Sequence, residues 1–274
     1  MSNRTKIEMN KYIEKLLNDA AQASLDCDLD LLKTIYSDLK VYNQSSWRDL
    51  DEYADDIEYE YDLCSNAACG LEGEEKGLEC LKFLHENGCK WNYRTCAQAA
   101  SKGHLKILKY AHDNGCPWTE STCYMAAYMG RLDCLKYAHE NGCPWDTTTC
   151  INAASMGRLD CLKYAHENGC PWKNDNSPDL CNGAAQNGQL ELLKYAHEHG
   201  FKWNEETCEE AAENGHLDCL KYARENGCPW NINKCERVCK NRACREYIHS
   251  SFATALRKFH NLLQRGVEIE SQLY

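Results

Sequence analysis

The stretch that decides the fold is Thr122–Asp146, with the sequence TCYMAAYMGRLDCLKYAHENGCPWD, because close copies of it recur along the chain. One glycine marks the LKYAHENGCPW half of every copy: Gly88, Gly115, Gly142, Gly169, Gly200 and Gly227. Successive glycines are 27, 27, 27, 31 and 27 residues apart, and the longer step contains a four-residue insertion near Asn174–Pro178. A fixed period of this size is typical of proteins built from stacked repeats.

Two short helices fit each repeat. In the copy above, residues 122–129 and 132–141 each carry one apolar stripe at helical spacing. Gly142 is placed to end the second helix in the left-handed conformation, and Pro144 cannot continue it. Asp146 then stands where the next helix needs an N-cap. The equivalent N-cap place is filled by Asn92, Asn204 and Asn231.

Neither helix can bury its stripe alone, so the repeats are expected to stack into a continuous all-α solenoid. We expect three parts. Residues 1–61 form a helical cap with a degenerate repeat and an acidic segment, residues 62–231 hold six repeats, and residues 232–274 form a degenerate repeat and a C-terminal helical cap. Atypical end repeats are typical of solenoids, because they must close the core with a polar face.

The pattern A-A-x-x-G-[HR]-L-x-x-L-K-x-x-x-x-x-G resembles the helix pair of the ankyrin repeat, and Gly103-His104-Leu105 and Gly215-His216-Leu217 carry its G-H-L. An ankyrin repeat has about 33 residues and a β-hairpin finger. Here the repeat is shorter and begins its loop with G-C-P-W, so the fingers should be lost or much reduced. This Cys-Pro-Trp variant is similar to ankyrin-like repeat proteins of large DNA viruses of amoebae and protists.

The resemblance implies a non-enzymatic scaffold that binds a partner protein on its concave face, a host protein if the viral likeness holds. The positions that vary between repeats match that face: Ser101, Lys102, Tyr124, Met125, Tyr128, Met129, Ile151, Ser155, Met156, Gln186, Asn187 and Glu213. They are apolar in the third and fourth repeats, where Met and Tyr offer adaptable contacts. They become acidic in the sixth repeat. We expect a monomer with no cofactor.

Composition excludes further classes of function and location. The net charge of −11 disfavours nucleic-acid binding, which needs a basic face. The sequence contains no long apolar run for a membrane span and no secretion signal at its start, so the 20 cysteines are expected to be free thiols in the cytoplasm. The segment Asp49–Asp62 carries eight acidic residues, which fit either a solvated linker or a site for a basic partner.

A tryptophan follows the glycine in all six repeats: Trp91, Trp118, Trp145, Trp172, Trp203 and Trp230. An unvaried large aromatic residue indicates a structural role, as a buried plug between neighbouring repeats. The alternative is a ladder on which a ligand stacks.

The cysteines fall into three columns, and two of these columns also accept Ile, Leu or Phe. This exchange indicates that the thiols pack as small apolar side chains rather than bind metal. The alternative function is a redox- or metal-responsive protein. His139 and Cys143 repeat as a pair four residues apart, but an enzyme needs one such site. We therefore expect the histidine to cap its helix, and the lysine column to pair with acids four residues on.

Overall fold

The computed structural model describes residues 3–41, 62–171 and 179–251, together with 253, 254 and 257. Within these ranges every regular element is a helix and no strand is present. The prediction of an all-α repeat solenoid without hairpin fingers is therefore confirmed. The acidic segment up to residue 61, the insertion at 174–178, and Trp172 lie outside the described residues.

Six helix pairs follow two N-terminal helices. The N-terminal helices are α1 (Asn3–Leu25) and α2 (Leu29–Val41). The pairs are α3 (Leu63–Cys69) with α4 (Glu74–Glu86), α5 (Tyr93–Lys102) with α6 (Leu105–Asp113), α7 (Glu120–Tyr128) with α8 (Leu132–Glu140), α9 (Thr147–Ser155) with α10 (Leu159–Glu167), α11 (Asp179–Gln186) with α12 (Leu190–Glu198), and α13 (Glu205–Glu213) with α14 (Leu217–Glu225). The last labelled helix is α15 (Ile232–Val238), and residues 242–251 are also helical.

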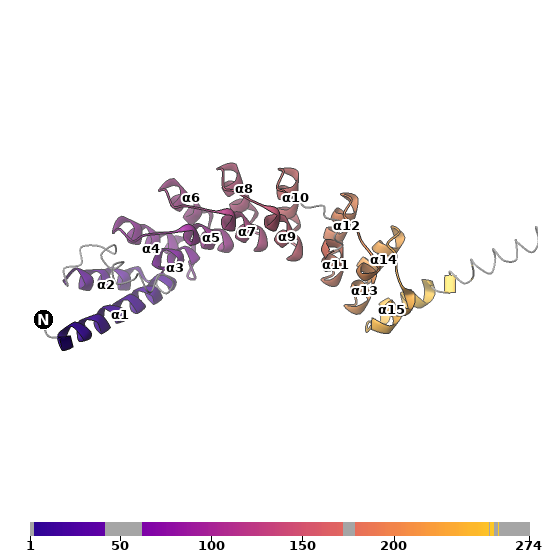
Figure 1. The fold of residues 1–274 in the computed structure, drawn as a ribbon, viewed down its shortest axis with the longest axis horizontal. Coiled ribbons are helices and arrows are strands. Elements are labelled where there is room, and N and C mark those ends of the chain that lie inside the picture. Colours follow the sequence, from indigo (N-terminus) through magenta and orange to yellow (C-terminus); the bar gives the residue numbers. More distant parts are fainter. Residues whose placement is uncertain (1–2, 42–61, 172–178, 252, 255–256, 258–274) are drawn as a thin grey trace, which may run out of the picture. The chain divides into compact units, whose positions relative to one another are not determined.

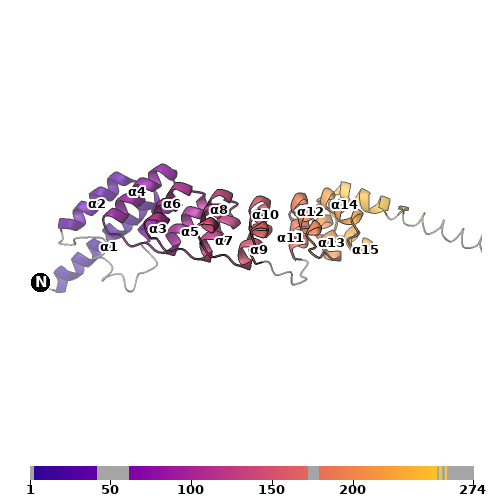
Figure 2. The same cartoon turned by 90° about the horizontal axis from the view of Figure 1, so that it is seen from above.

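The chain divides into two compact units, residues 1–172 and 173–274. In each unit the first helix of a pair packs on the first helix of the next pair, and second helices pack likewise. In the first unit this gives one row of α3, α5, α7 and α9 and another row of α4, α6, α8 and α10 (Figure 1). Seen from above, the pairs within each unit follow one another in chain order (Figure 2).

The predicted N-caps are present. Asp146 accepts a hydrogen bond from the Thr148 amide at the start of α9, and Asn92, Asn204 and Asn231 cap α5, α13 and α15 in the same way. These side chains satisfy amides that have no partner inside the helix. These four helices therefore begin directly after the residues expected to cap them. In contrast, α7 begins at Glu120, two residues before the expected start at 122, and its N-cap is Thr119.

The glycine column ends the second helices. Gly142 has a φ of +82°, its amide donates to the His139 carbonyl at 3.0 Å, and the Cys143 amide donates to the Ala138 carbonyl at 2.9 Å. These two bonds form a Schellman motif, which needs a left-handed residue and favours glycine. Because the cysteine amide closes the motif, the G-C dipeptide ends the helix as a unit.

The glycine after each first helix has a second use. A Cβ at Gly130 would lie 2.8 Å from Cδ of Arg158, which belongs to the next repeat. Arg131 lies in the same way against Gly103, and His216 against Gly188. The G-[HR]-L pattern therefore reflects a contact between repeats. The glycine of one repeat leaves space, and the arginine or histidine of the next repeat occupies it.

The core lies between the two rows of helices. The alanine pair of each first helix and the leucine of each second helix are almost fully buried, as are Cys123 and Cys134. At the N-terminal end, Ala20, Leu32 and Ile35 close the stack, and the buried Ser24 hydroxyl donates to the Leu63 carbonyl at 2.5 Å. α1 therefore packs against the first repeat through both apolar and polar contacts.

Candidate functional site

The variable positions of α7 and α9 form an apolar surface. We name it the α7–α9 patch, and its residues are Tyr124, Met125, Tyr128, Met129, Ile151 and Met156. The side chains of Ile151 and Met156 are 54% and 37% exposed, although both are large and apolar. The rings of Tyr124 and Tyr128 lie 6.0 Å apart. The four patch residues from Tyr124 to Met129 are partly exposed, so two neighbouring helices present apolar side chains that the stack covers only in part.

The structure corrects the predicted surface at Ser101. This side chain is only 8% exposed and donates to the Gln98 carbonyl at 2.9 Å. Arg131 of the next repeat covers the end of α5, and its Nε donates to the Ser101 carbonyl at 3.3 Å. Ser101 is therefore a contact between repeats, whereas Lys102 and Ser155 are exposed.

The remaining predicted positions belong to the second unit. Gln186 and Asn187 at the end of α11 are exposed and polar, and the Asn187 amide donates to the Gly183 carbonyl at 2.9 Å. Glu213 on α13 is exposed and pairs with Lys240 at 3.5 Å. Glu209 pairs with Lys234 at 2.8 Å. The first-helix surface of this unit is therefore polar and acidic, without the apolar side chains of the α7–α9 patch.

The described tryptophans lie between neighbouring repeats but are half-buried rather than enclosed. Trp145 stacks on His139 with ring centroids 3.7 Å apart, and its edge meets Tyr164 of the next repeat at 6.2 Å. Trp91, Trp118 and Trp203 repeat the arrangement. In the last repeat Arg224 replaces the histidine and lies 4.3 Å above the Trp230 ring. A flat side chain therefore lies on the tryptophan ring in each of these repeats, even where arginine replaces histidine.

The expected helix-capping role of the histidines is wrong. The side-chain amide of Asn141 donates to the Tyr137 carbonyl at 2.8 Å and so occupies the helix end. His139 instead stacks on Trp145, and its Nδ1 lies 2.9 Å from the hydroxyl of Tyr164. His112 and His197 make the same bond to Tyr137 and Tyr222. The histidine column therefore ties each repeat to the next.

The lysine column also differs from expectation. Lys82, Lys109 and Lys136 do not pair with the acids four residues on. Their ammonium groups lie over the rings of Tyr110, Tyr137 and Tyr164, at 5.4 to 5.7 Å from the centroids. Because each tyrosine belongs to the following repeat, these cation–π contacts add to the links between repeats.

Eighteen of the twenty cysteines are buried, and the two that are partly exposed are Cys69 and Cys89. The loop thiols of Cys116, Cys143 and Cys228 donate to the carbonyls of the first-helix N-cap residues Asn92, Thr119 and Asn204 at 3.2 to 3.3 Å. This bond holds each loop against the start of its own repeat. Phe201 fills the same place in the fifth repeat, where it is also buried.

Thiols from two columns also lie next to each other. The pairs are Cys64 with Cys89, Cys96 with Cys116, Cys123 with Cys143, Cys150 with Cys170, and Cys208 with Cys228. A hydrogen bond between partners, followed by burial, raises the pKa of the Cys123 thiol, and the same bond lowers the pKa of Cys143. Each pair is a polar contact within one repeat, and both thiols are buried in every pair except Cys64 with Cys89.

In the described part of the chain, no cluster of three or more His, Cys, Asp or Glu side chains is suited to hold a metal ion. The sequence pair His139 and Cys143 is not a nucleophile with its base, since the histidine bonds Tyr164 and the thiol bonds the Thr119 carbonyl. Among the described helices, none has both the length and the apolar character needed to cross a bilayer.

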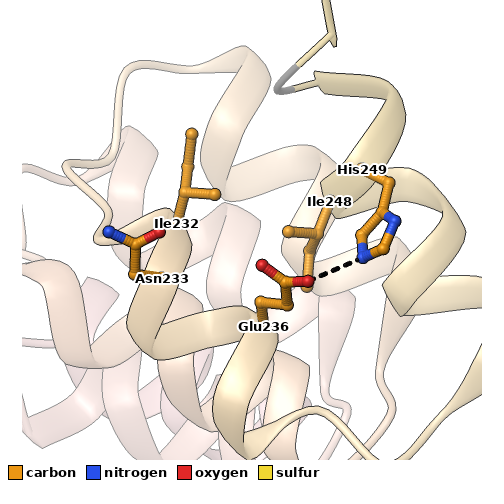
Figure 3. A pocket seen from close by; sticks show the side chains of 5 residues that line it. All are labelled: Ile232, Asn233, Glu236, Ile248 and His249. Atoms are coloured by element: carbon orange, nitrogen blue, oxygen red, sulfur yellow. Dashed lines mark hydrogen bonds and ion pairs between the residues drawn. The ribbon is translucent and has the colours of Figure 1, made fainter.

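A shallow pocket of about 340 Å³ lies beside α15, and no motif in the sequence predicted it. Ile232, Asn233 and Glu236 line it from one helix, and Ile248 and His249 from residues 242–251 (Figure 3). The His249 Nε2 lies 2.9 Å from Glu236, and both side chains are about half exposed. An exposed ion pair of this kind is typical of a protein surface.

Comparison with known proteins agrees with this geometry. Two stretches, residues 96–139 and 123–166, match the family model for ankyrin repeats in many copies. Residues 96–166 of the solenoid are therefore similar to ankyrin repeats. The crystal structure of the human ASB11 ankyrin repeat domain matches with a TM-score of 0.55, covering 68% of this chain and 95% of that chain. At 16% sequence identity this likeness is one of fold. No curated protein matches the sequence.

Proposed function

We propose that this protein is a non-enzymatic scaffold that binds a partner protein on the α7–α9 patch. Ankyrin repeats are generally modules for protein–protein interaction, and the fold is typical of scaffolds rather than enzymes. The observation that carries the proposal is the exposure of Ile151 and Met156 on α9, beside the tyrosines and methionines of α7. Adjacent exposed apolar side chains mark interaction surfaces more often than isolated ones do.

The apolar residues of the patch are not needed to hold the repeats together. Residues that hold repeats together, such as the tryptophans and the glycines, recur in every repeat. The patch residues change from repeat to repeat, and the matching positions of α11 are Gln186 and Asn187. Positions that vary while the scaffold is kept are those that can specify a partner. We place this binding in the cytoplasm, with a monomer as the binding form and a host protein as the partner if the viral likeness holds.

The experiment is affinity capture from cell lysate with identification by mass spectrometry. Wild type is compared with the variant Tyr128→Glu/Met129→Glu/Met156→Glu. The matched control, Lys202→Glu/Ala243→Glu, adds the same negative charge at exposed positions of the second unit. We expect the patch variant to lose partners that the control retains, with unchanged helical circular dichroism in both. Identical partner lists for all three proteins would reject the patch as the binding surface.

One observation favours a second candidate, a redox-responsive protein: the cysteines lie in thiol pairs. Burial opposes this function, because both thiols of most pairs are shielded from solvent and packed among alanine side chains. Reactive cysteines lie in partly exposed sites where a thiolate forms readily. The pairs are therefore better explained as buried polar contacts that hold the loops.

A further inference from the structure

We infer that the α7–α9 patch takes an acidic, amphipathic peptide segment of the partner, with apolar side chains on the patch and carboxylates on Arg131 and Arg158. This inference rests on the proposed function, since it names the chemistry of the partner at the same surface. It is carried by the cations beside the patch rather than by the patch alone.

The contacts between repeats fix where the two arginines lie. Arg158 packs on Gly130, and its Nε donates to the Tyr128 carbonyl at 3.4 Å, so its guanidinium stands at the end of α7. Arg131 packs on Gly103, and its Nε donates to the Ser101 carbonyl at the end of α5, beside Lys102. Both cations are therefore held at the ends of first helices, next to the variable positions.

Both guanidinium groups have N–H donors that form no hydrogen bond in the described part of the chain. Each uses Nε for a carbonyl, and within the described ranges neither arginine forms an ion pair with a carboxylate. Asp133 and Asp160 stand two residues later in the first turns of α8 and α10. The terminal nitrogens form the planar fork that binds a carboxylate with two hydrogen bonds.

The arginines occur together with the apolar side chains. Arg131 and Arg158 occupy equivalent positions in their repeats. The same position holds His104 in the second repeat, Gln189 in the fifth and His216 in the sixth. Arginine is thus found in the third and fourth repeats, the same two that carry the patch. Histidine makes the glycine contact equally well, as His216 does against Gly188. The packing contact therefore does not require arginine.

The variable positions from α5 to α9 also hold no acidic side chain, although the chain is otherwise rich in acids. The variable positions of these helices hold Lys102 and uncharged side chains, although the whole chain has 42 acidic against 31 basic residues. In α13 the same positions hold Glu209, Glu210 and Glu213. A local cationic rim around an apolar patch complements a segment with the opposite charge.

The test measures fluorescence polarisation of three labelled peptide pools on the full chain. All pools have about 12 residues with leucine and phenylalanine at the same places, and they differ only in acidic, neutral or basic filler residues. We expect the acidic pool to bind at least about tenfold more tightly than the other two. Loss of binding by Tyr128→Glu/Met129→Glu/Met156→Glu would place the complex on the patch.

The arginines are tested with two variants and a control. Arg131→Gln/Arg158→Gln should remove the preference for the acidic pool, and Arg131→Lys/Arg158→Lys should keep part of it, because charge remains without the fork. The control Lys202→Gln/Arg237→Gln removes two exposed cations of the second unit and should change nothing. Circular dichroism melting shows whether each variant is folded.

Other outcomes would overturn the inference. Equal binding of all pools, or preference for the basic pool, would reject the acidic segment, yet loss of that binding in the patch variant would still support the proposed function. Acidic binding that survives the glutamine variants would reject the role of the arginines. Failure of every pool to bind would reject a peptide segment as the occupant, while the lysate capture judges the proposed function separately.

Discussion

Trp145 shows how one side chain joins two repeats. It stacks on His139 of its own repeat and meets Tyr164 of the next, while the histidine and the tyrosine bond to each other at 2.9 Å. The half-buried indole thus links two neighbouring repeats at their surface, outside the core between the rows of helices. The unvaried tryptophan column is therefore explained by contacts between repeats.

We expect Trp145→Ala to lower the free energy of unfolding by roughly 2–3 kcal/mol, below the usual cost for a core aromatic because the indole is half-buried. Urea denaturation followed by circular dichroism measures the change. Trp145→Phe serves as the control and should lose less, since a ring remains against His139. A loss under about 0.5 kcal/mol, the size of an ordinary surface change, would contradict the structural role.

His85 predicts a dependence of stability on pH. Burial against Trp91 lowers the pKa of His85 from its ordinary value of 6.5, and the nearby Glu86 opposes the shift only in part. The unfolded chain then binds the proton more readily than the folded chain. The contribution of His85 to stability is therefore full above about pH 6.5 and is lost as the pH falls from there through the folded pKa.

The variant His85→Phe keeps a ring against Trp91 and cannot take up a proton. Urea midpoints at about pH 7.5 and about pH 5 should fall less for the variant than for wild type. All other titrating groups are common to both proteins, so the difference isolates His85. A wild type that loses no more stability on acidification than the variant would show that the histidine is not desolvated.

At the scale of the elements, most helix boundaries could be predicted from the sequence, although α7 begins two residues before its expected start. The glycine period set the repeat length, and Asp146 and Gly142 marked a helix start and end that the structure confirms. These signals are local, because a cap bonds amides or carbonyls within a few residues of itself.

The side-chain partners between repeats could not be predicted. His139 and Tyr164 are 25 residues apart, and their bond depends on how two helix pairs stack. The predicted exposure of Ser101 was wrong for the same reason. Its position on the helix indicated an exposed side chain, but Arg131 of the next repeat covers it. Of the predicted site, the structure brings together the α7 and α9 positions, which are neighbours in one unit.

The two kinds of glycine should respond differently to substitution. Gly142 has a φ of +82° and open space around it, so Gly142→Ala should cost roughly 1–2 kcal/mol of backbone strain. Gly130 has a φ of +71°, and its added Cβ would also meet Arg158 at 2.8 Å. We expect Gly130→Ala to cost up to about 1 kcal/mol more, because the exposed Arg158 side chain can shift only in part without losing its bond to the Tyr128 carbonyl.

Urea denaturation of both variants provides the comparison. The double variant Gly130→Ala/Arg158→Ala removes the clash and should recover most of the additional loss. If the two single variants are equally destabilised, the glycine does not serve to admit the arginine of the next repeat.

At the scale of the whole molecule, the stack buries nearly all of its thiols. Cys69 and Cys89 are partly exposed and the other eighteen are buried. A thiol reagent should therefore react rapidly with about two cysteines of the native protein and with the rest only after unfolding in denaturant. Rapid reaction of most thiols, or disulfides formed in the native protein by mild peroxide, would favour the redox-responsive alternative.

The central claim is that the α7–α9 patch contacts the partner, and site-specific photo-crosslinking tests it most directly. A photoreactive side chain replaces Ile151, which is exposed on α9, or Glu167, which is exposed at the end of α10 in the other row of helices. The proposed function predicts a covalent adduct with a captured partner from position 151 and none from position 167. An adduct from position 167 alone would contradict it and place binding on the second helices.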